Sequence, residues 1–247
     1  MSDRPKVQIS CAGPWSNHFG VCIVDLVLAT LNAHAGGVPA VEQLWVNHRM
    51  GSILPQLRHQ AVRDAQKREA THLLFVDSDQ TFPSTTVIQL LSHRLSVVGC
   101  NVATKSFPAN PTARKKGSTP TGELVFTSER SPALEKVWRL GFGIMLIELS
   151  VFAKLAPPWF GITYRPEVDD YQGEDWYFCE RLEEAGIGLY VDHIVSLNVG
   201  HVGDHTYTHE ECLPPGGARD TLIPDLMDAL KEAHTKRIKQ KEVALAG

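Results

Sequence analysis

Two carboxylates stand one residue apart at the end of a short apolar run. Residues 73–76 read Leu-Leu-Phe-Val, and Asp77-Ser78-Asp79 follows directly. Such an unbroken run is typical of a strand buried on both faces, and its carboxyl end opens into the crevice where α/β sheets bind ligands. Hard oxygen ligands there suit Mg²⁺ or Mn²⁺ carried in with a phosphate. An Asx turn that merely closes the strand explains the same triplet without any ligand.

A second carboxylate pair, Glu174 and Asp175, follows Gly173 at the start of an amphipathic segment. Positions 178, 182 and 185 are apolar at helical spacing, and Gly186 is a typical C-cap, so residues 173–186 are predicted to be a helix. Acidic residues in a first turn stabilise the helix dipole by about 0.3–1 kcal/mol. A carboxylate held there beside a cleft also suits a general base, and the two interpretations stay open at this point.

Histidines gather further along the chain, at His201, His205 and His209, with Cys212 close behind. These four side chains are of the types that bind zinc. Their even spacing would need a helix, however, and Gly203 with the following Thr-Tyr-Thr stretch favours a loop. Zinc is therefore the minor interpretation of this cluster.

The stretch 103–130 is irregular and contains the basic run Arg114-Lys115-Lys116 among turn-forming residues. A basic run is usually solvated surface, but its place after a strand also leaves room to grip a polyanionic acceptor or pyrophosphate. Residues 137–147 then read as one strand with close backbone approach at Gly141 and Gly143. These glycines are not a dinucleotide fingerprint, because a third glycine and an adjoining helix are missing.

The elements that would position these residues alternate between strand and helix, which predicts an α/β architecture with substantial parallel pairing. The helix 17–33 is expected to be mostly buried, and residues 195–199 are expected to extend the strand layer. Residues 1–212 are assigned to one domain, and residues 213–247 to a linker and a C-terminal helix packed on it or extending it. Strands are predicted at 6–12, 41–46, 73–76, 96–102, 137–147 and 189–192, and helices at 17–33, 53–70, 84–92, 151–155, 173–186 and 221–244.

Composition limits the classes of function. With 43% hydrophobic and 21% charged residues among 247, the chain has the make-up of an ordinary globular protein. A net charge of -4 argues against coating nucleic acid through overall charge, though it allows a local basic groove. Five scattered cysteines do not suggest a disulfide framework. We expect a cytoplasmic protein without a membrane segment, since no apolar run reaches spanning length.

Four stretches, taken in order along the sequence, resemble the motifs of family-2-like GT-A glycosyltransferases. The match covers residues 6–204, and the ordered set carries it, because an Asp-x-Asp triplet alone is common. The stretches are residues 70–79, similar to the Asp-x-Asp strand; 140–147, similar to the strand beneath the donor sugar; Gly173-Glu174-Asp175, similar to the Glu-Asp motif; and 199–203, similar to the His-x-Gly segment. The resemblance implies a Rossmann-like, mixed and mostly parallel sheet flanked by helices.

The resemblance also implies metal-dependent hexosyl transfer from a nucleotide-sugar, most commonly a UDP-sugar, to an acceptor hydroxyl. Mn²⁺ or Mg²⁺ would be held by Asp79 and His201, and by Asp77 directly or through the ribose. Asp175 would deprotonate the acceptor hydroxyl, oriented by Glu174 or by the helix N-terminus. The remaining residues implied to bind the nucleotide-sugar are Cys11, Ala12, Gly13, Pro14, Arg58, Asp77, Gly141 and Gly143, although His59 stands where the family pairs an asparagine with the arginine.

The acceptor implied by the resemblance is hydroxymethylated DNA. The stretches around Asp77 and Glu174 look like those of bacteriophage-encoded members, some of which glycosylate hydroxymethylpyrimidines in their DNA. Arg114, Lys115 and Lys116 would contact phosphates, and a duplex base would need flipping. The alternatives are a glycan or protein acceptor, or a nucleic-acid-binding protein without turnover. A nucleotidyltransferase is disfavoured because no Gly-rich phosphate loop lies near the first strand.

Overall fold

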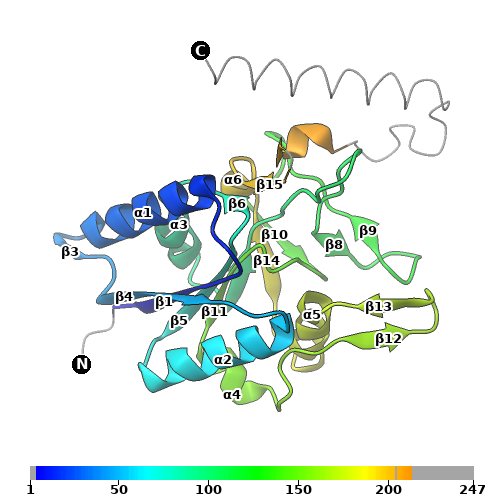
Figure 1. Cartoon of the computed structure of the whole chain (residues 1–247), viewed down its shortest axis with the longest axis horizontal. Helices are drawn as coiled ribbons and strands as arrows, with labels where there is room; N and C mark the ends of the chain where they lie inside the picture. The colour runs from blue at the N-terminus through cyan, green and yellow to red at the C-terminus, as the bar shows by residue number, and fades with distance from the viewer. Residues whose placement is uncertain (1–3, 204, 213–247) are drawn as a thin grey trace.

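The computed structural model describes residues 4–203 and 205–212, built around a seven-stranded sheet in the order β10-β14-β7-β11-β5-β1-β4. Helices cover both faces of this sheet (Figure 1). The strands are β1 (Lys6–Ala12), β4 (Gln43–Arg49), β5 (His72–Asp77), β7 (Val97–Gly99), β10 (Leu134–Val137), β11 (Ile144–Glu148) and β14 (Leu189–Asp192).

Strands β4, β1, β5, β7 and β14 point the same way, whereas β11 and β10 run against them. The predicted mixed, mostly parallel α/β sheet is therefore confirmed. The prediction of one strand over residues 137–147 is wrong. That stretch divides between β10 and β11, which are separated in the sheet by β14 and β7, so the residues between them form a connection.

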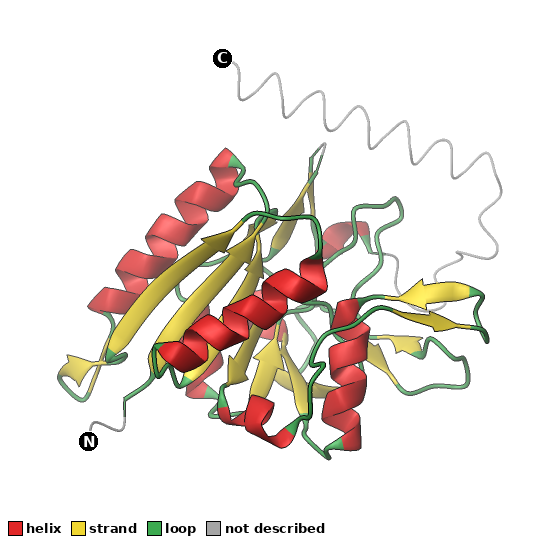
Figure 2. Ribbon diagram, turned by 60° about the horizontal axis from the view of Figure 1, so that its bottom comes forward, coloured by secondary structure: helices red, strands yellow, loops and turns green. Residues whose placement is uncertain are grey.

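The two faces of the sheet carry separate apolar clusters, and β5 shows why. Leu73 and Phe75 pack into one cluster, and Leu74 and Val76 into the other, as the period of two in a strand requires. Figure 2 shows the helices laid across the strands. Helices α2 (Leu54–Lys67), α4 (Ser150–Lys154) and α5 (Glu174–Glu184) cover the first face, and α1 (Asn17–Asn32), α3 (Thr86–Ser92) and α6 (His193–Ser196) the second.

Two sequence predictions about local structure need correction. Helix α1 is not mostly buried: Phe19, Ile23 and Leu26 face the sheet, and an opposite apolar stripe that includes Val24 and Leu28 is exposed. A helix on a sheet buries only the side that contacts it. Residues 195–199 do not extend the strand layer, because the Asp192 carboxylate accepts from the backbone N–H of Val195 at 2.8 Å and caps α6 instead.

Short antiparallel pairs surround the main sheet on the side of the candidate site. Strands β6, β15 and β16 form one small sheet, β12 with β13 forms a hairpin, and β8 pairs with β9. Their bounds are β6 (Gln80–Thr81), β8 (Arg114–Lys115), β9 (Glu123–Leu124), β12 (Thr163–Arg165), β13 (Asp170–Gln172), β15 (Gly200–Val202) and β16 (Thr206–Tyr207), with β2 (His34–Ala35) and β3 (Val38–Pro39) as a hairpin after α1 and η1 (His209–Glu211) as a 3₁₀ turn.

The predicted linker and terminal helix, residues 213–247, lie outside the described residues. Within the described part of the chain, no helix combines the length and the apolar character that crossing a bilayer requires.

Candidate functional site

Asp79 and His201 are brought together by strand pairing across 122 positions of sequence. Strand β6 begins directly after Asp79, and β15 pairs with it so that His201 lies opposite Gln80. The backbone N–H of Val202 donates to the Asp79 carbonyl at 2.7 Å, which fixes this register. The His201 Nε2 atom then lies 3.3 Å from Asp79 Oδ2. The structure thus assembles two of the three metal ligands predicted from the sequence.

The imidazole of His201 is oriented by the backbone. Its Nδ1 lies 2.9 Å from the carbonyl of Ala103, which can only accept, so Nδ1 carries the proton in this contact. Nε2 is therefore the ring nitrogen that faces the Asp79 carboxylate. Ligand atoms about 2.1 Å from an octahedral cation lie about 3 Å from each other, so the separation of these two atoms fits Mg²⁺ or Mn²⁺.

Two further polar groups border the Asp79 carboxylate. Lys105 Nζ lies 2.6 Å from Oδ2, and the buried Gln80 side chain donates to Oδ1 at 3.3 Å. The Oε1 atom of Gln80 has no hydrogen-bond partner among the described residues. Partial burial opposes ionisation, but His201 and Lys105 hold the pKa of Asp79 well below its usual range. Lys105 was not among the site residues predicted from the sequence. Its signal was position: it follows β7, whose carboxyl end opens into the same crevice as that of β5.

Asp77 contacts a different side chain, and its place in the predicted ligand set stays a prediction. Its Oδ1 accepts from Arg58 Nη2 at 3.1 Å, and Arg58 Nε donates to Glu174 Oε1 at 3.0 Å. Among the described residues no group of three His, Cys, Asp or Glu side chains is placed to hold one metal ion. A cation here would take two protein ligands, and phosphate or water would fill the remaining positions, as Mg²⁺ commonly requires.

Arg58 is the buried link between the two carboxylate pairs found in the sequence. Its side chain is 4% exposed and packs near the rings of Phe75 and Phe142, with the guanidinium carbon 5.3 and 4.5 Å from their centroids. Burial alone would lower the pKa of Arg58, but the charges of Asp77 and Glu174 outweigh it and raise that pKa. The cation therefore joins the end of β5 to the start of α5.

Asp175 lies in the first turn of α5 and lines a cavity of about 270 Å³. Its Oδ1 accepts from the backbone N–H of Trp176 at 2.7 Å. Burial, with a further contribution from the neighbouring charge of Glu174, raises the pKa of Asp175 to about 6. Trp138, Tyr171 and Trp176 line the same cavity. A carboxylate that ionises near pH 6 at the wall of a cavity has the properties of a general base at neutral pH.

The segment predicted to meet the nucleotide base lies at the end of β1, beside Asp77. Gly13 has φ of 88°, its N–H donates to the Arg49 carbonyl at 3.0 Å, and its carbonyl lies 2.7 Å from His48 Nε2. Cys11 is fully buried, and burial raises the pKa of its thiol to about 12. The next three residues, Ala12, Gly13 and Pro14, lie nearer the surface. Contact of these residues with a donor stays a prediction.

Gly141 and Gly143 are both buried, and the close backbone approach predicted for them is confirmed. A Cβ atom at Gly143 would lie 2.9 Å from Val102 Cγ2, and one at Gly141 would lie 3.2 Å from Thr112 Cβ. The Gly143 carbonyl also accepts from the backbone N–H of Asp77 at 3.0 Å. The neighbouring side chains of Val102 and Thr112 explain why both positions are glycine. A role of these glycines in binding the donor stays a prediction.

The basic run does not form one uncompensated patch. Arg114 lies over the ring of Trp176, at 5.7 Å from its centroid, whereas Lys115 pairs with Glu135 and Lys116 with Glu183. The alternative zinc cluster is not assembled in the described residues either. His209 Nε2 instead lies 2.9 Å from the carbonyl of Asn101.

Comparison with known proteins supports the fold. No protein-family model and no curated protein matches the chain. Among solved structures, A197 from STIV is similar at 16% identity with a TM-score of 0.52, over 83% of this chain and 91% of that one. Mannose-1-phosphate geranyltransferase from Thermus thermophilus (12% identity, 61% of this chain and 59% of that one) has a TM-score of only 0.38. CMP:2-keto-3-deoxy-manno-octonic acid synthetase complexed with CTP (13%, 76% and 89%) has a TM-score of 0.39. At these identities the likeness to A197 shows a shared α/β architecture, and the other two carry no argument.

Proposed function

We propose that this protein is a metal-dependent glycosyltransferase that moves a sugar from a nucleotide-sugar, with a UDP-sugar as the expected donor, to an acceptor hydroxyl. The observation that carries the proposal is the Arg58 link. It ties the strand that ends at Asp77, two residues before Asp79, to the helix that begins with Glu174 and Asp175. A pair of cation ligands and a carboxylate of raised pKa are thereby attached to one buried scaffold, as transfer from a pyrophosphate leaving group requires.

Each residue has a separate task in this mechanism. Asp79 and His201 would hold Mn²⁺ or Mg²⁺, which when bound supplies Lewis-acid neutralisation of the leaving pyrophosphate. Asp175 takes the proton of the acceptor hydroxyl while the acceptor oxygen bonds to the anomeric carbon and the carbon–oxygen bond to phosphate breaks. The guanidinium of Arg58 donates to both Asp77 and Glu174 and holds the two side chains in place. Lys105, whose ammonium group pairs with Asp79, would offer a second positive charge to the donor phosphates.

The cavity beside Asp175 supports a ring-shaped acceptor, because Trp138, Tyr171 and Trp176 present aromatic surface around the proposed base. The acceptor proposed from the sequence is a hydroxymethylpyrimidine in DNA, with a glycan or a protein as the alternative. Arg114 of the basic run lies over Trp176, which lines this cavity. Lys115 and Lys116 each face a carboxylate already, which weakens their proposed role as phosphate contacts of that acceptor.

Donor turnover is the decisive test. A panel of nucleotide-sugars is incubated with hydroxymethylated DNA, unmodified DNA and oligosaccharides, with Mn²⁺, Mg²⁺ or chelator. We expect hydrolysis or transfer that needs the metal and is lost in Asp79→Asn. The control is Asp25→Asn, the same change at an exposed position of α1. Full activity of Asp79→Asn in chelator would overturn the mechanism. Equal transfer to the two DNAs would remove the hydroxymethyl acceptor while leaving glycosyl transfer standing.

A further inference from the structure

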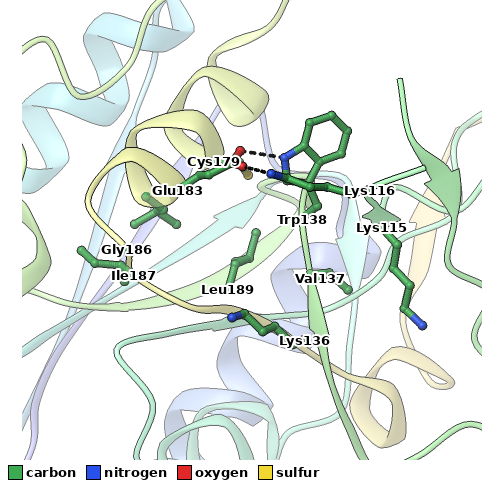
Figure 3. A pocket seen from close by; sticks show the side chains of 11 residues that line it. Lys115, Lys116, Lys136, Val137, Trp138, Cys179, Glu183, Gly186, Ile187 and Leu189 are labelled. Carbon is green, nitrogen blue, oxygen red and sulfur yellow. Dashed lines mark hydrogen bonds and ion pairs between the residues drawn. The ribbon is translucent and has the colours of Figure 1, made fainter. Parts of the chain in front are cut away.

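A second cavity, of about 400 Å³, lies at the edge of the main sheet, between β10, the carboxyl end of α5 and β8. Val137, Leu182 and Leu189 form its apolar floor. Lys115, Lys116 and Lys136 also line it (Figure 3). None of the residues proposed for metal binding or proton transfer lines this cavity. Its size falls within the roughly 300–1,000 Å³ that is typical of ligand sites.

The charge of this cavity differs from that of the chain. The protein carries a net charge of -4, yet three lysines line the cavity against one carboxylate, Glu183. Lys115 is compensated by Glu135 just outside the lining, and Lys116 by Glu183. Lys136 is exposed and forms no ion pair with any described residue. One ammonium group at the cavity is therefore left without a counter-charge.

We propose that this cavity binds a phosphate-bearing ligand whose apolar or planar part lies on the floor and whose phosphate is held by Lys136 with Lys116. Lysine ammonium groups bind phosphate as point charges, and the apolar floor gives a reason for a ligand larger than phosphate alone. A free nucleotide and a nucleotide within a single strand share this chemistry. The site goes beyond the proposed glycosyl transfer and does not depend on it.

The cavity is also connected to the wall of the Asp175 cavity. Glu183 accepts from Trp138 Nε1 at 2.7 Å and from Arg139 Nη1 at 3.1 Å, and it pairs with Lys116 through its other oxygen. Lys116 first, then Trp138 and Arg139, lower the pKa of Glu183 to about 2. A phosphate that draws Lys116 away from Glu183 would disturb the contacts of Trp138 and Arg139, which both line the Asp175 cavity.

Binding measurements test the site. Titration calorimetry in chelator compares inorganic phosphate, thymidine monophosphate and a short single-stranded DNA on the full chain. We expect the nucleotide or the strand to bind more tightly than phosphate, and Lys136→Glu to weaken binding at least tenfold. Lys136→Gln should have a smaller effect. Lys154→Glu, which changes an exposed lysine of α4, should have none.

The outcomes separate the alternatives. Equal binding of thymidine monophosphate and of the strand assigns a free nucleotide, whereas binding of the strand alone assigns a phosphodiester chain. Unchanged binding in Lys136→Glu, or an equal loss in Lys154→Glu, would overturn the site. Metal-dependent hydrolysis of the nucleotide-sugar should be unchanged in Lys136→Glu, so failure of this proposal and failure of the proposed glycosyl transfer are distinguishable.

Discussion

The cavity beside Asp175 (the Asp175 cavity) and the cavity lined by Lys115, Lys116 and Lys136 (the lysine cavity) share the side chain of Trp138. The ion pairs at the two cavities differ in how deeply they are buried. Asp175, at the wall of the first cavity, directly follows Glu174 in the sequence. The carboxylates of Glu174 and Asp77 contact the buried Arg58, whose side chain is 4% exposed. The lysine cavity is bordered by the Lys116–Glu183 pair, in which the lysine is 69% exposed. Buried ion pairs keep their side chains in a fixed arrangement, because breaking such a pair leaves a buried charge without a partner. Exposed ion pairs exchange readily with water and ions.

Their charge balance differs as well. The Asp175 cavity is lined by Arg139 and Arg165 against Glu167, Asp170 and Asp175, so acidic groups are in excess. The lysine cavity has the opposite excess. An acidic surrounding helps to keep the pKa of a carboxylate high enough for proton transfer, and a basic one retains anions. Local sorting of charge therefore matters more here than the net charge of the chain.

The largest expected effect is on sugar transfer, and it should be confined to the Asp175 cavity. Asp175→Asn removes the proposed base, so transfer should fall by about 10²–10⁴-fold, the usual contribution of general base catalysis. Binding of nucleotide at the lysine cavity should not change. The measurement is kcat/KM for sugar transfer beside calorimetry on the same preparation. Retained transfer in this variant would mean that another group accepts the proton.

The second test compares how much the buried ion pairs of Arg58 and the exposed ion pair of Lys116 contribute to the free energy of unfolding. Arg58→Met leaves Asp77 and Glu174 without their buried cation, which should lower the free energy of unfolding by about 3–5 kcal/mol. Lys116→Met removes one partner of an exposed pair and should cost about 0–1 kcal/mol. Urea denaturation of both variants measures the difference. Equal losses would contradict the distinction between the cavities.

The pH dependence of transfer sharpens the role assigned to Asp175. Its pKa is raised to about 6, so the proton-accepting form is present above pH 6 and is lost as the pH falls through that value. We expect kcat/KM to fall below pH 6 and to level off above it. Glu174→Gln removes one of the charges that raise this pKa, so the acidic limb should move to lower pH. A shift to higher pH would exclude Asp175 as the titrating group.

Sequence patterns predicted the parts of the molecule that depend on local periodicity. The strands at residues 6–12 and 189–192 have the predicted bounds, and α5 (Glu174–Glu184) lies within the predicted helix 173–186. The unbroken apolar run from Leu73 to Val76 correctly placed Asp77 and Asp79 at the end of a buried strand. These features follow from neighbouring residues alone.

Long-range pairing was harder to predict. Nothing local to Asp77 shows that Arg58 contacts its carboxylate, because the helix and strand that carry them meet only in the folded sheet. Lys105 lies in an irregular stretch without a motif, so its contact with Asp79 was missed. Residues 137–147 looked like one strand because the break between β10 and β11 depends on which strands lie between them.

The smallest expected effect concerns Lys105, which contacts the Asp79 oxygen that also faces His201. If Asp79 and His201 bind Mn²⁺, the ammonium group competes with the ion for that oxygen. Lys105→Ala should then tighten Mn²⁺ binding several-fold in the absence of donor, measured by electron paramagnetic resonance of the free ion. Lys105→Arg, which keeps the charge, is the matched control and should bind Mn²⁺ like the unmodified protein. Weaker Mn²⁺ binding in Lys105→Ala would mean that the lysine supports the ion site instead of competing with it.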